Sequence, residues 1–393
     1  MNKKKVYLVN GKRTPFGKFG GALKDITPVD LSVYASRALL TEIKLDASLI
    51  DQVILGNVVP ASTDTMYGGR HLALKLGCKI ETPGICINRL CGSGIEAILQ
   101  AARIIRMDEA NCILASGTEN MSMIPHLVYG SRFGTKYGAL KTVDMLLDAL
   151  TDQFTATPMG ITAENLAEKF QLTRESCDKY SVNSHTKAAK AYKDGHLQGE
   201  ITAIQLKKET ISKDEHLREI LNVDDLKKLP TTFKKDGVVT AASASGIVDG
   251  AASVIVASED FCKKNNLSPL VEIIDGEVIG VDPKIMGIGP SPAIKNLMKR
   301  NNLNFNDIDL FEINEAFAAQ TISCLKDLEL PEEKLNVWGG AIALGHPLGA
   351  SGVRISLSLA RQINILGKNR GIASACIGGG QGIAMLVARA NFK

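Results

Sequence analysis

Short apolar runs alternate with longer amphipathic segments over much of the chain. Residues 6–9, 53–55, 112–114 and 311–313 are short runs with the character of buried strands. The segment 95–107 is longer and has the apolar spacing of a helix. Strands separated by helices are typical of layered architectures, so we predict an α/β fold.

The same order of motifs occurs twice in the chain. Cys-Gly-Ser-Gly at 91–94 precedes a helical run, and Gly-Ala-Ser-Gly at 349–352 does so 258 residues later. Two further pairs of segments share this offset, which indicates two copies of one domain. The first strand has its counterpart at 271–276 with an offset of 265, which implies a small change in length between the copies.

This repeat predicts the domain organisation. We expect residues 1–118 to form an N-terminal domain, completed by about 250–270, and residues 271–393 to form the C-terminal domain. The segment between them, 119–249, is rich in Lys, Asp and Glu and carries helical runs. We interpret it as an inserted loop domain, for which a solvated decoration and a substrate-binding lid are both open explanations.

Composition and charge narrow the class of protein. Charged residues make up 22% and hydrophobic residues 45%, which excludes a disordered chain and a coiled coil. The net charge is only +4 and the one basic cluster is Lys3 to Lys5, so we expect no nucleic-acid partner. The longest uncharged stretch, 371–388, is rich in glycine, which disfavours a membrane-spanning helix. Because no targeting segment is apparent, we expect a soluble, cytoplasmic protein.

Cysteine chemistry is the strongest functional signal. The eight cysteines include no C-x-x-C pair, so we expect neither a structural metal site nor a disulfide scaffold. Cys91 stands between a predicted strand at 85–88 and the predicted helix, and the positive end of a helix dipole favours a thiolate. Gly92 and Gly94 leave the neighbouring backbone open to a substrate. Cys91 is therefore the candidate nucleophile.

Three further residues can serve such a nucleophile. His346 lies in a glycine-rich turn before the equivalent helix of the second copy, where an imidazole can take a thiol proton. Cys376 ends a predicted strand and opens a turn of glycines whose N–H groups can form an oxyanion hole, although a tight hairpin explains the turn equally well. Asn314 also follows a strand and can donate a hydrogen bond, but taken alone it is better explained as a helix cap.

Taken in order, these motifs resemble those of the thiolases, which include acetyl-CoA C-acetyltransferases and 3-ketoacyl-CoA thiolases. The resemblance covers essentially the whole chain and implies a duplicated, five-layered α/β/α/β/α fold with an inserted loop domain for CoA binding and oligomerisation. The segments that carry it are 13–17, 88–94, 119–122, 159–165, 244–251, 312–318, 339–352 and 375–382.

The resemblance implies a role for each candidate residue. Cys91 becomes acylated, His346 activates it, and Cys376 exchanges the proton of the substrate carbon. Asn314 positions a water that, with His346, stabilises the thioester oxygen. The backbone N–H groups of Cys91 and Gly378 hold the oxyanion of the acyl-enzyme step. Neither a metal nor a resident cofactor is implied.

It also implies residues for substrate binding and assembly. Ser245 and Ala244 contact the pantetheine arm of coenzyme A, and Met159 and Phe317 wall the acyl pocket. The partners implied are acyl-CoA substrates and further copies of the chain, in a homotetramer. The family places a tetramerisation loop where this chain has residues 128–134.

The main hypothesis for function is the reversible condensation of two acetyl-CoA to acetoacetyl-CoA and CoA, favoured by the pattern at 147–152. Pro158 resembles instead the degradative thiolases that accept longer chains, because acetoacetyl-specific members commonly have His there. A 3-ketoacyl-CoA thiolase of broader chain length is therefore the alternative. A β-ketoacyl synthase is disfavoured by Cys376, and a non-catalytic, lipid-binding scaffold by the presence of Cys91, His346 and Cys376 together.

Overall fold

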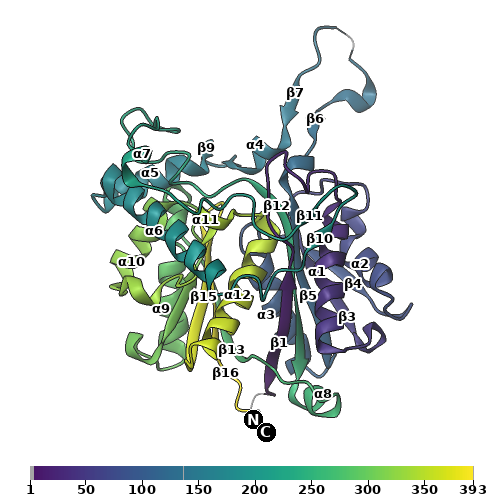
Figure 1. The fold of residues 1–393 in the computed structure, drawn as a ribbon. Helices are drawn as coiled ribbons and strands as arrows, with labels where there is room; N and C mark the ends of the chain where they lie inside the picture. The colour runs from purple at the N-terminus through teal and green to yellow at the C-terminus, as the bar shows by residue number, and fades with distance from the viewer. Residues whose placement is uncertain (1–3, 136, 393) are drawn as a thin grey trace.

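The computed structural model describes residues 4–135 and 137–392. Lys3, part of the basic cluster at the start of the chain, lies outside these residues. The molecule is built on a ten-stranded sheet made of two halves (Figure 1). The halves meet where β1 pairs with β13 through only two residue pairs, Tyr7 with Glu272 and Leu8 with Val271. The two halves of the sheet are therefore joined by only a narrow contact.

Each half has its strands in the same spatial order. In the first half these are β1 (Val6–Arg13), β12 (Val248–Ser258), β5 (Cys112–Asn120), β3 (Gln52–Gly56) and β4 (Gly84–Ile87), with β2 (Gly17–Lys18) paired to β12. In the second half they are β13 (Val271–Gly280), β16 (Gln381–Arg389), β15 (Arg370–Ile377) and β14 (Leu310–Ile313).

The duplication extends to strand register. Gln52 of β3 pairs with Ile113 of β5, and the residues 258 positions later, Leu310 and Gly371, pair in the same parallel manner. The β1 ladder is interrupted by an irregularity after Leu8, and β13 has one at the corresponding place, 265 positions later. Both offsets seen in the sequence are thus confirmed at the level of single residue pairs.

The helices complete five layers. One outer layer contains α1 (Pro28–Ile43) and α2 (Gly68–Leu76), and the other contains α9 (Pro290–Arg300) and α10 (Ala318–Leu328). Between the two half-sheets lie α3 (Ser93–Arg106) and α12 (Leu348–Ile365), which contact each other and strands of both halves. The predicted α/β/α/β/α architecture is confirmed.

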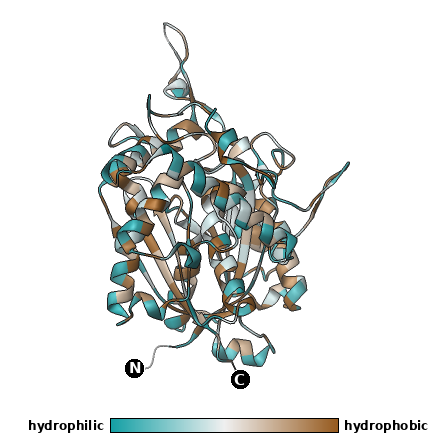
Figure 2. Cartoon of the chain, turned by 60° about the vertical axis from the view of Figure 1, so that its left-hand side comes forward, coloured by the Kyte–Doolittle hydropathy of each residue, from teal (hydrophilic) through white to brown (hydrophobic). Residues whose placement is uncertain are grey.

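The largest core cluster lies in this central layer. It joins α3 and α12 to β1, β5, β12, β13, β15 and β16 through fully buried aliphatic side chains. Figure 2 shows the same division, with hydrophobic colour along the inner strands and hydrophilic colour on the surface helices. Burial on both faces explains why these strands appear in the sequence as continuous apolar runs.

Local signals set where elements begin and end. The Thr27 side chain caps α1 by accepting a hydrogen bond from Asp30 N, and Pro28 occupies the first turn, where its missing N–H costs nothing. The helix ends at Lys44 in a left-handed conformation. The short α8 (Glu259–Lys264) is likewise capped by Ser258. Sequence and structure agree closely at these boundaries.

Residues 121–247 form an excursion between β5 and β12. It contains α4 (Met145–Ala149), α5 (Met159–Lys169), α6 (Arg174–Lys193) and α7 (Val223–Leu226), together with three short two-stranded sheets. These sheets pair β6 (His126–Val128) with β7 (Thr142–Asp144), β8 (Thr151–Asp152) with β9 (Thr157–Pro158), and β10 (Ile204–Gln205) with β11 (Thr210–Ile211). The β6–β7 hairpin projects from the body at the end opposite both termini (Figure 1). No helix within the described ranges is long and apolar enough to cross a membrane.

Candidate active site

Cys91 lies on the turn between β4 and α3. Leu90, just before it, has φ of +47°, an uncommon conformation for a residue with a branched side chain. The turn is held by a hydrogen bond from Leu90 N to Asn88 Oδ1 at 2.9 Å and by one from Ser93 N to Leu90 O at 2.9 Å. This arrangement aims the thiol away from the helix and towards the other half of the molecule.

The end of β15 lies opposite that thiol. A Cβ on Gly92 would come within 2.6 Å of Ile377 Cδ1, so the start of α3 rests directly on this strand end. The Gly378 N–H faces the Cys91 sulfur, and Cys376 is close enough for charge on one thiol to raise the pKa of the other. The two cysteines and the glycine turn are therefore brought together as expected.

The protonation state of Cys91 differs from expectation. Cys91 is partly exposed, but burial of its sulfur raises the pKa to about 11 despite the N–H groups of Gly378 and Cys91 that oppose the shift. The helix terminus alone thus does not produce a thiolate in the resting protein, because desolvation outweighs it. The thiol needs a base at the moment of reaction.

His346 has the environment of such a base. Its backbone N donates to Gly246 O at 2.9 Å, and its Nδ1 lies 2.6 Å from Ser351 Oγ. The Ser351 hydroxyl donates to Pro347 O at 3.0 Å, so Ser351 Oγ accepts from Nδ1–H and Nε2 keeps its lone pair. Burial, aided by the charge of Arg354, lowers the pKa of His346 to about 3. The imidazole is therefore neutral and able to accept a proton.

Asn314 completes the catalytic group. It is fully buried after β14, and its Nδ2 lies 3.3 Å from His346 Nε2. It does not cap a helix, since α10 begins four residues later. Asn314 Oδ1 is buried without a hydrogen-bond partner, which marks a place where a water or a substrate group binds.

The neighbouring Glu315 anchors this asparagine to the excursion. Its buried carboxylate accepts hydrogen bonds from Tyr180 and Ser184 of α6 at 2.9 and 2.7 Å. It also accepts from Ile342 N, at the start of α11 (Ala341–Leu344), at 3.1 Å. One carboxylate therefore connects the strand that carries Asn314 to the segment that leads into His346. Sequence reasoning assigned no role to Glu315.

Cys376 lies at the end of β15, and burial raises its pKa well above the ordinary value. The resting residue is therefore a protonated thiol, which can donate a proton. The glycine turn after it is indeed a hairpin between β15 and β16, with positive φ at Gly379 and Gly380. The hairpin still leaves Gly378 N–H facing Cys91, so the tight hairpin is confirmed and the oxyanion hole stays a prediction.

The residues expected to bind substrate also gather here. Ala244 forms an isolated bridge with Phe317, and Ser245 N donates to Ala316 O at 3.0 Å. A Cβ on Gly378 would lie 3.5 Å from Met159 Sδ, which places Met159 beside the turn that follows Cys376. All four predicted binding residues thus border the catalytic group.

Phe233 belongs to the same wall and was missed. Its ring packs edge-on to Phe317 at 6.2 Å between centroids, and it covers Gly160, next to Met159. No periodic pattern of apolar residues pointed to Phe233, because it lies in an irregular loop. A phenylalanine followed by two lysines in such a loop is a weak hint of an apolar wall.

A cavity of about 320 Å³ lies beside the residues expected to bind substrate. Its lining includes Ala241 and Ala242, which lie shortly before Ala244 in the chain, together with charged, histidine and leucine side chains. His185 is buried and lines this cavity. The lining residues are His185, His216, Arg218, Leu221, Asp225, Leu226, Leu229, Ala241 and Ala242.

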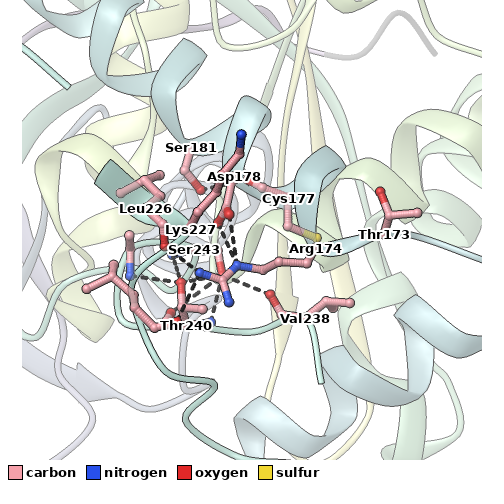
Figure 3. A network of polar contacts seen from close by, with 12 residues as sticks. Thr173, Arg174, Cys177, Asp178, Ser181, Leu226, Lys227, Val238, Thr240 and Ser243 are labelled. Carbon is pink, nitrogen blue, oxygen red and sulfur yellow. Dashed lines mark hydrogen bonds and ion pairs between the residues drawn. The ribbon is translucent and has the colours of Figure 1, made fainter. Parts of the chain in front are cut away.

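Arg174 holds one wall of this cavity in place (Figure 3). From α6 it forms an ion pair with Asp178 at 2.8 Å, and it donates to the carbonyl oxygens of Leu226 and Leu229 at 2.6 and 3.2 Å. Thr240 and Ser243, joined by short hydrogen bonds, lie in the same network. The cavity wall is therefore fixed to a helix by charge-assisted bonds.

Comparison with known proteins agrees with this site. The model of the thiolase N-terminal domain matches residues 6–260, and that of the C-terminal domain matches 267–389. The chain belongs to the thiolase family. It is 48% identical over 387 residues to the human mitochondrial 3-ketoacyl-CoA thiolase, covering 97% of this chain and 98% of that protein.

Two further comparisons extend this result. The thiolase is 45% identical over 392 residues to a probable acetyl-CoA acyltransferase of Staphylococcus aureus, covering 98% and 99% of the two chains. The crystal structure of the human mitochondrial enzyme in complex with CoA superimposes with a TM-score of 0.97 at 48% identity over 98% of each chain. The duplicated fold is therefore that of the family.

The expectation of a cytoplasmic protein is wrong in the light of these relatives, because the human and mouse proteins are named as mitochondrial. That expectation rested only on the lack of an address segment, and such a lack carries no physical information about the compartment. The division into residues 1–118, 119–249 and 271–393 stays a prediction, as does the homotetramer.

Proposed function

We propose that this thiolase is a 3-ketoacyl-CoA thiolase, which cleaves a 3-ketoacyl-CoA with CoA into acetyl-CoA and a shortened acyl-CoA. Two observations carry the proposal: Cys91 lies opposite Gly378 and Cys376, and Asn314 Nδ2 lies 3.3 Å from His346 Nε2. The relatives named as 3-ketoacyl-CoA thiolases support this choice over acetoacetyl-CoA synthesis, and Pro158 points the same way.

In the first half-reaction the Cys91 thiol gives its proton to His346 Nε2, and the thiolate attacks carbon 3 of the substrate. The N–H groups of Cys91 and Gly378 stabilise the oxyanion that forms. Such donors are each worth about a hundred- to thousand-fold in rate. The bond between carbons 2 and 3 then breaks, and carbon 2 takes its proton from the Cys376 thiol. Acetyl-CoA leaves, and the acyl group stays on Cys91.

The second half-reaction restores each proton. The Cys376 thiolate takes the proton of the incoming CoA thiol, and the CoA thiolate attacks the acyl carbon on Cys91. The Cys91 sulfur leaves and recovers the proton held by His346. During carbanion chemistry Asn314, whose Oδ1 is without a partner, fixes a water that shares the thioester oxygen with His346. No step requires a metal or a redox cofactor.

We assign the cavity beside the Ala244 segment to the nucleotide part of CoA. Arg218 offers charge to a phosphate, and Leu221, Leu226 and Leu229 offer apolar contact to an adenine ring. Two of its lining residues, Ala241 and Ala242, lie shortly before Ala244 and Ser245 in the chain. We assign Ala244 and Ser245 to the pantetheine arm. Met159, Phe317 and Phe233 then wall the acyl group.

The substrate assignment is tested by chain length. Purified protein is assayed for CoA-dependent cleavage of acetoacetyl-CoA and of 3-ketooctanoyl-CoA, with Cys91→Ala as the inactive control. We expect kcat/KM for the eight-carbon substrate to equal or exceed that for acetoacetyl-CoA. Cleavage restricted to acetoacetyl-CoA would instead identify an acetyl-CoA C-acetyltransferase. Acyl transfer in the Cys91→Ala variant would contradict the mechanism.

We also propose that the enzyme assembles as a homotetramer through the β6–β7 hairpin. Its tip exposes Tyr129, Phe133 and Tyr137, and burying such rings between copies removes a large apolar surface from water. Light scattering is expected to give four times the chain mass. A Phe133→Asp, Tyr137→Asp variant is expected to give dimers, and a wild-type monomer would contradict the proposal.

A further inference from the structure

The second copy has its own counterpart of the nucleophile turn. Gly349 lies 258 residues after Cys91, at the start of the matching helix α12. A Cβ on Gly349 would lie 2.5 Å from the Thr118 carbonyl oxygen and 2.7 Å from that of Gly56. The backbone here is thus seated on the ends of β3 and β5, as the Cys91 turn is seated on the end of β15.

A carboxylate occupies this second turn. Gly349 N donates to Glu119 Oε2 at 3.0 Å, and Val58 N donates to the same oxygen at 3.0 Å. Glu119 Oε1 accepts from Val59 N and from Asn57 Nδ2, each at 3.0 Å. Glu119 is fully buried, which raises the pKa of its carboxyl to about 7, and its four neutral N–H donors oppose this shift by favouring the ionised form. The arrangement is a cradle for an anion.

The two copies therefore use equivalent N–H groups in different ways. We assign the N–H of Cys91 to the oxyanion of the substrate, whereas the N–H of Gly349 is satisfied permanently by Glu119. The cradle of the second copy is closed by a side chain of the first copy. This explains why only one of the two repeated turns is open to substrate.

Glu119 also connects to the catalytic base. Gly349 is three residues after His346 and two before Ser351, whose hydroxyl orients the imidazole. Val58 and Leu348, on either side of the carboxylate, pack in one apolar cluster with Leu90 and Cys91. The carboxylate thus ties the segment that carries His346 to the surroundings of the nucleophile.

We propose that Glu119 is a positioning residue of the thiolase reaction: its carboxylate fills the anion cradle of the second copy and thereby holds the start of α12 so that His346 meets Cys91. The inference rests on the proposed function. Glu119 touches no reacting atom, so its removal changes kcat through the geometry of His346. A misplacement of about 1 Å at a catalytic group costs about a hundred-fold in rate.

Two variants separate positioning from simple packing. Glu119→Gln keeps the shape but directs an amide N–H₂ at N–H donors, which leaves unsatisfied buried groups. Glu119→Ala removes the atoms of one acetate ion and leaves the cradle empty. Added acetate is therefore expected to fill it, whereas acetamide, a neutral molecule of the same shape, is not. Asp51→Asn is the matched control, because Asp51 caps backbone N–H groups at the opposite end of β5.

The experiment measures thiolysis by wild type, Asp51→Asn, Glu119→Gln and Glu119→Ala, with and without acetate or acetamide. We expect kcat to fall about a hundred-fold in both Glu119 variants with KM for CoA within threefold, and acetate to restore at least tenfold in Glu119→Ala only. If Glu119→Ala is insoluble, the fall in kcat of soluble Glu119→Gln decides whether the inference holds. A kcat within twofold of wild type in a soluble Glu119 variant, or equal rescue by acetamide, overturns the inference. Inactive wild type would instead refute the proposed function.

Discussion

Gly94 of α3 and Gly352 of α12 face each other at the centre of the molecule. They are 258 residues apart and are equivalent positions of the two copies. A Cβ on Gly94 would lie 2.4 Å from Val353 N, and one on Gly352 would lie 2.4 Å from Ile95 N. The two helices therefore touch through their backbones, which brings the start of α3, with Cys91, next to the start of α12, with His346.

This contact predicts a large effect from a single methyl group. Gly352→Ala must separate the helices, and we expect it to lower the free energy of unfolding by about 1–3 kcal/mol. Because both helix starts move, kcat should also fall at least tenfold. Gly280→Ala is the control, since a Cβ there would meet only one atom, at 3.9 Å. Denaturant unfolding and thiolysis rates measure both effects, and equal behaviour of the two variants would contradict the account.

Acid should destabilise the protein partly through His346. Its pKa is lowered to about 3 by burial, whereas in the unfolded chain it is near 6.5. Between these values the unfolded state binds the extra proton, so stability is lost as pH falls through this window, by up to about 1.4 kcal/mol per pH unit for this group.

The variant His346→Asn removes this dependence. Between pH 6 and 4.5 its free energy of unfolding should fall less steeply than that of wild type. The two slopes should differ by up to about 1.4 kcal/mol per pH unit, the value for one proton. The exposed His126 provides the control substitution, His126→Asn, which should follow wild type. Parallel curves for wild type and His346→Asn would show that the imidazole is not held neutral.

The position of Arg174 predicts that its loss weakens CoA binding but leaves the rate of the chemical steps unchanged. Arg174→Ala frees the carbonyl groups of Leu226 and Leu229 and loosens one wall of the cavity assigned to CoA. We expect KM for CoA to rise roughly tenfold, as loss of one charge-assisted contact of about 1.5 kcal/mol would give, with kcat within twofold. Lys179→Ala removes an exposed ion pair of the same helix and should change neither. An unchanged KM for CoA in Arg174→Ala would contradict the assignment of this cavity to CoA.

The sequence predicted the α/β fold and its duplication for a physical reason, whereas the five layers and the roles of the site residues were implied by the resemblance to thiolases. Strand and helix periodicity is local, and the repeat offset carried the relation between Cys91 and the segment of His346 across the chain. The offsets were then found again as strand registers. Periodicity and the repeat offset can both be read without knowing which side chains contact each other in the folded protein.

What escaped prediction depends on the interior. Desolvation holds Cys91 and Cys376 as thiols, and no spacing in the sequence reveals how much water reaches a sulfur. Glu119 and Glu315 act through donors that lie far away in the chain, and Phe233 comes from an irregular loop. Such contacts exist only once both halves and the excursion are folded together.

The last prediction concerns the separate roles of His346 and Cys376. His346 lies beside Asn314, and we propose that it takes the Cys91 proton, so His346→Asn should impair acylation of Cys91 and carbon–carbon bond chemistry together. The Cys376 thiol is protonated and lies at the strand end opposite Cys91, and we propose that it serves the proton on carbon 2. Cys376→Ser keeps the size but has a hydroxyl far less acidic than a thiol. It should still acetylate Cys91 from acetyl-CoA and exchange labelled CoA at a rate within tenfold of wild type, while thiolysis falls at least a hundred-fold. Intact mass, labelled CoA exchange and thiolysis of the two variants decide this. In CoA exchange no carbon is protonated, so the proton that Cys91 gives to His346 can pass to the departing CoA thiolate without Cys376. Equal losses of exchange and thiolysis in Cys376→Ser would therefore leave Cys376 a structural thiol.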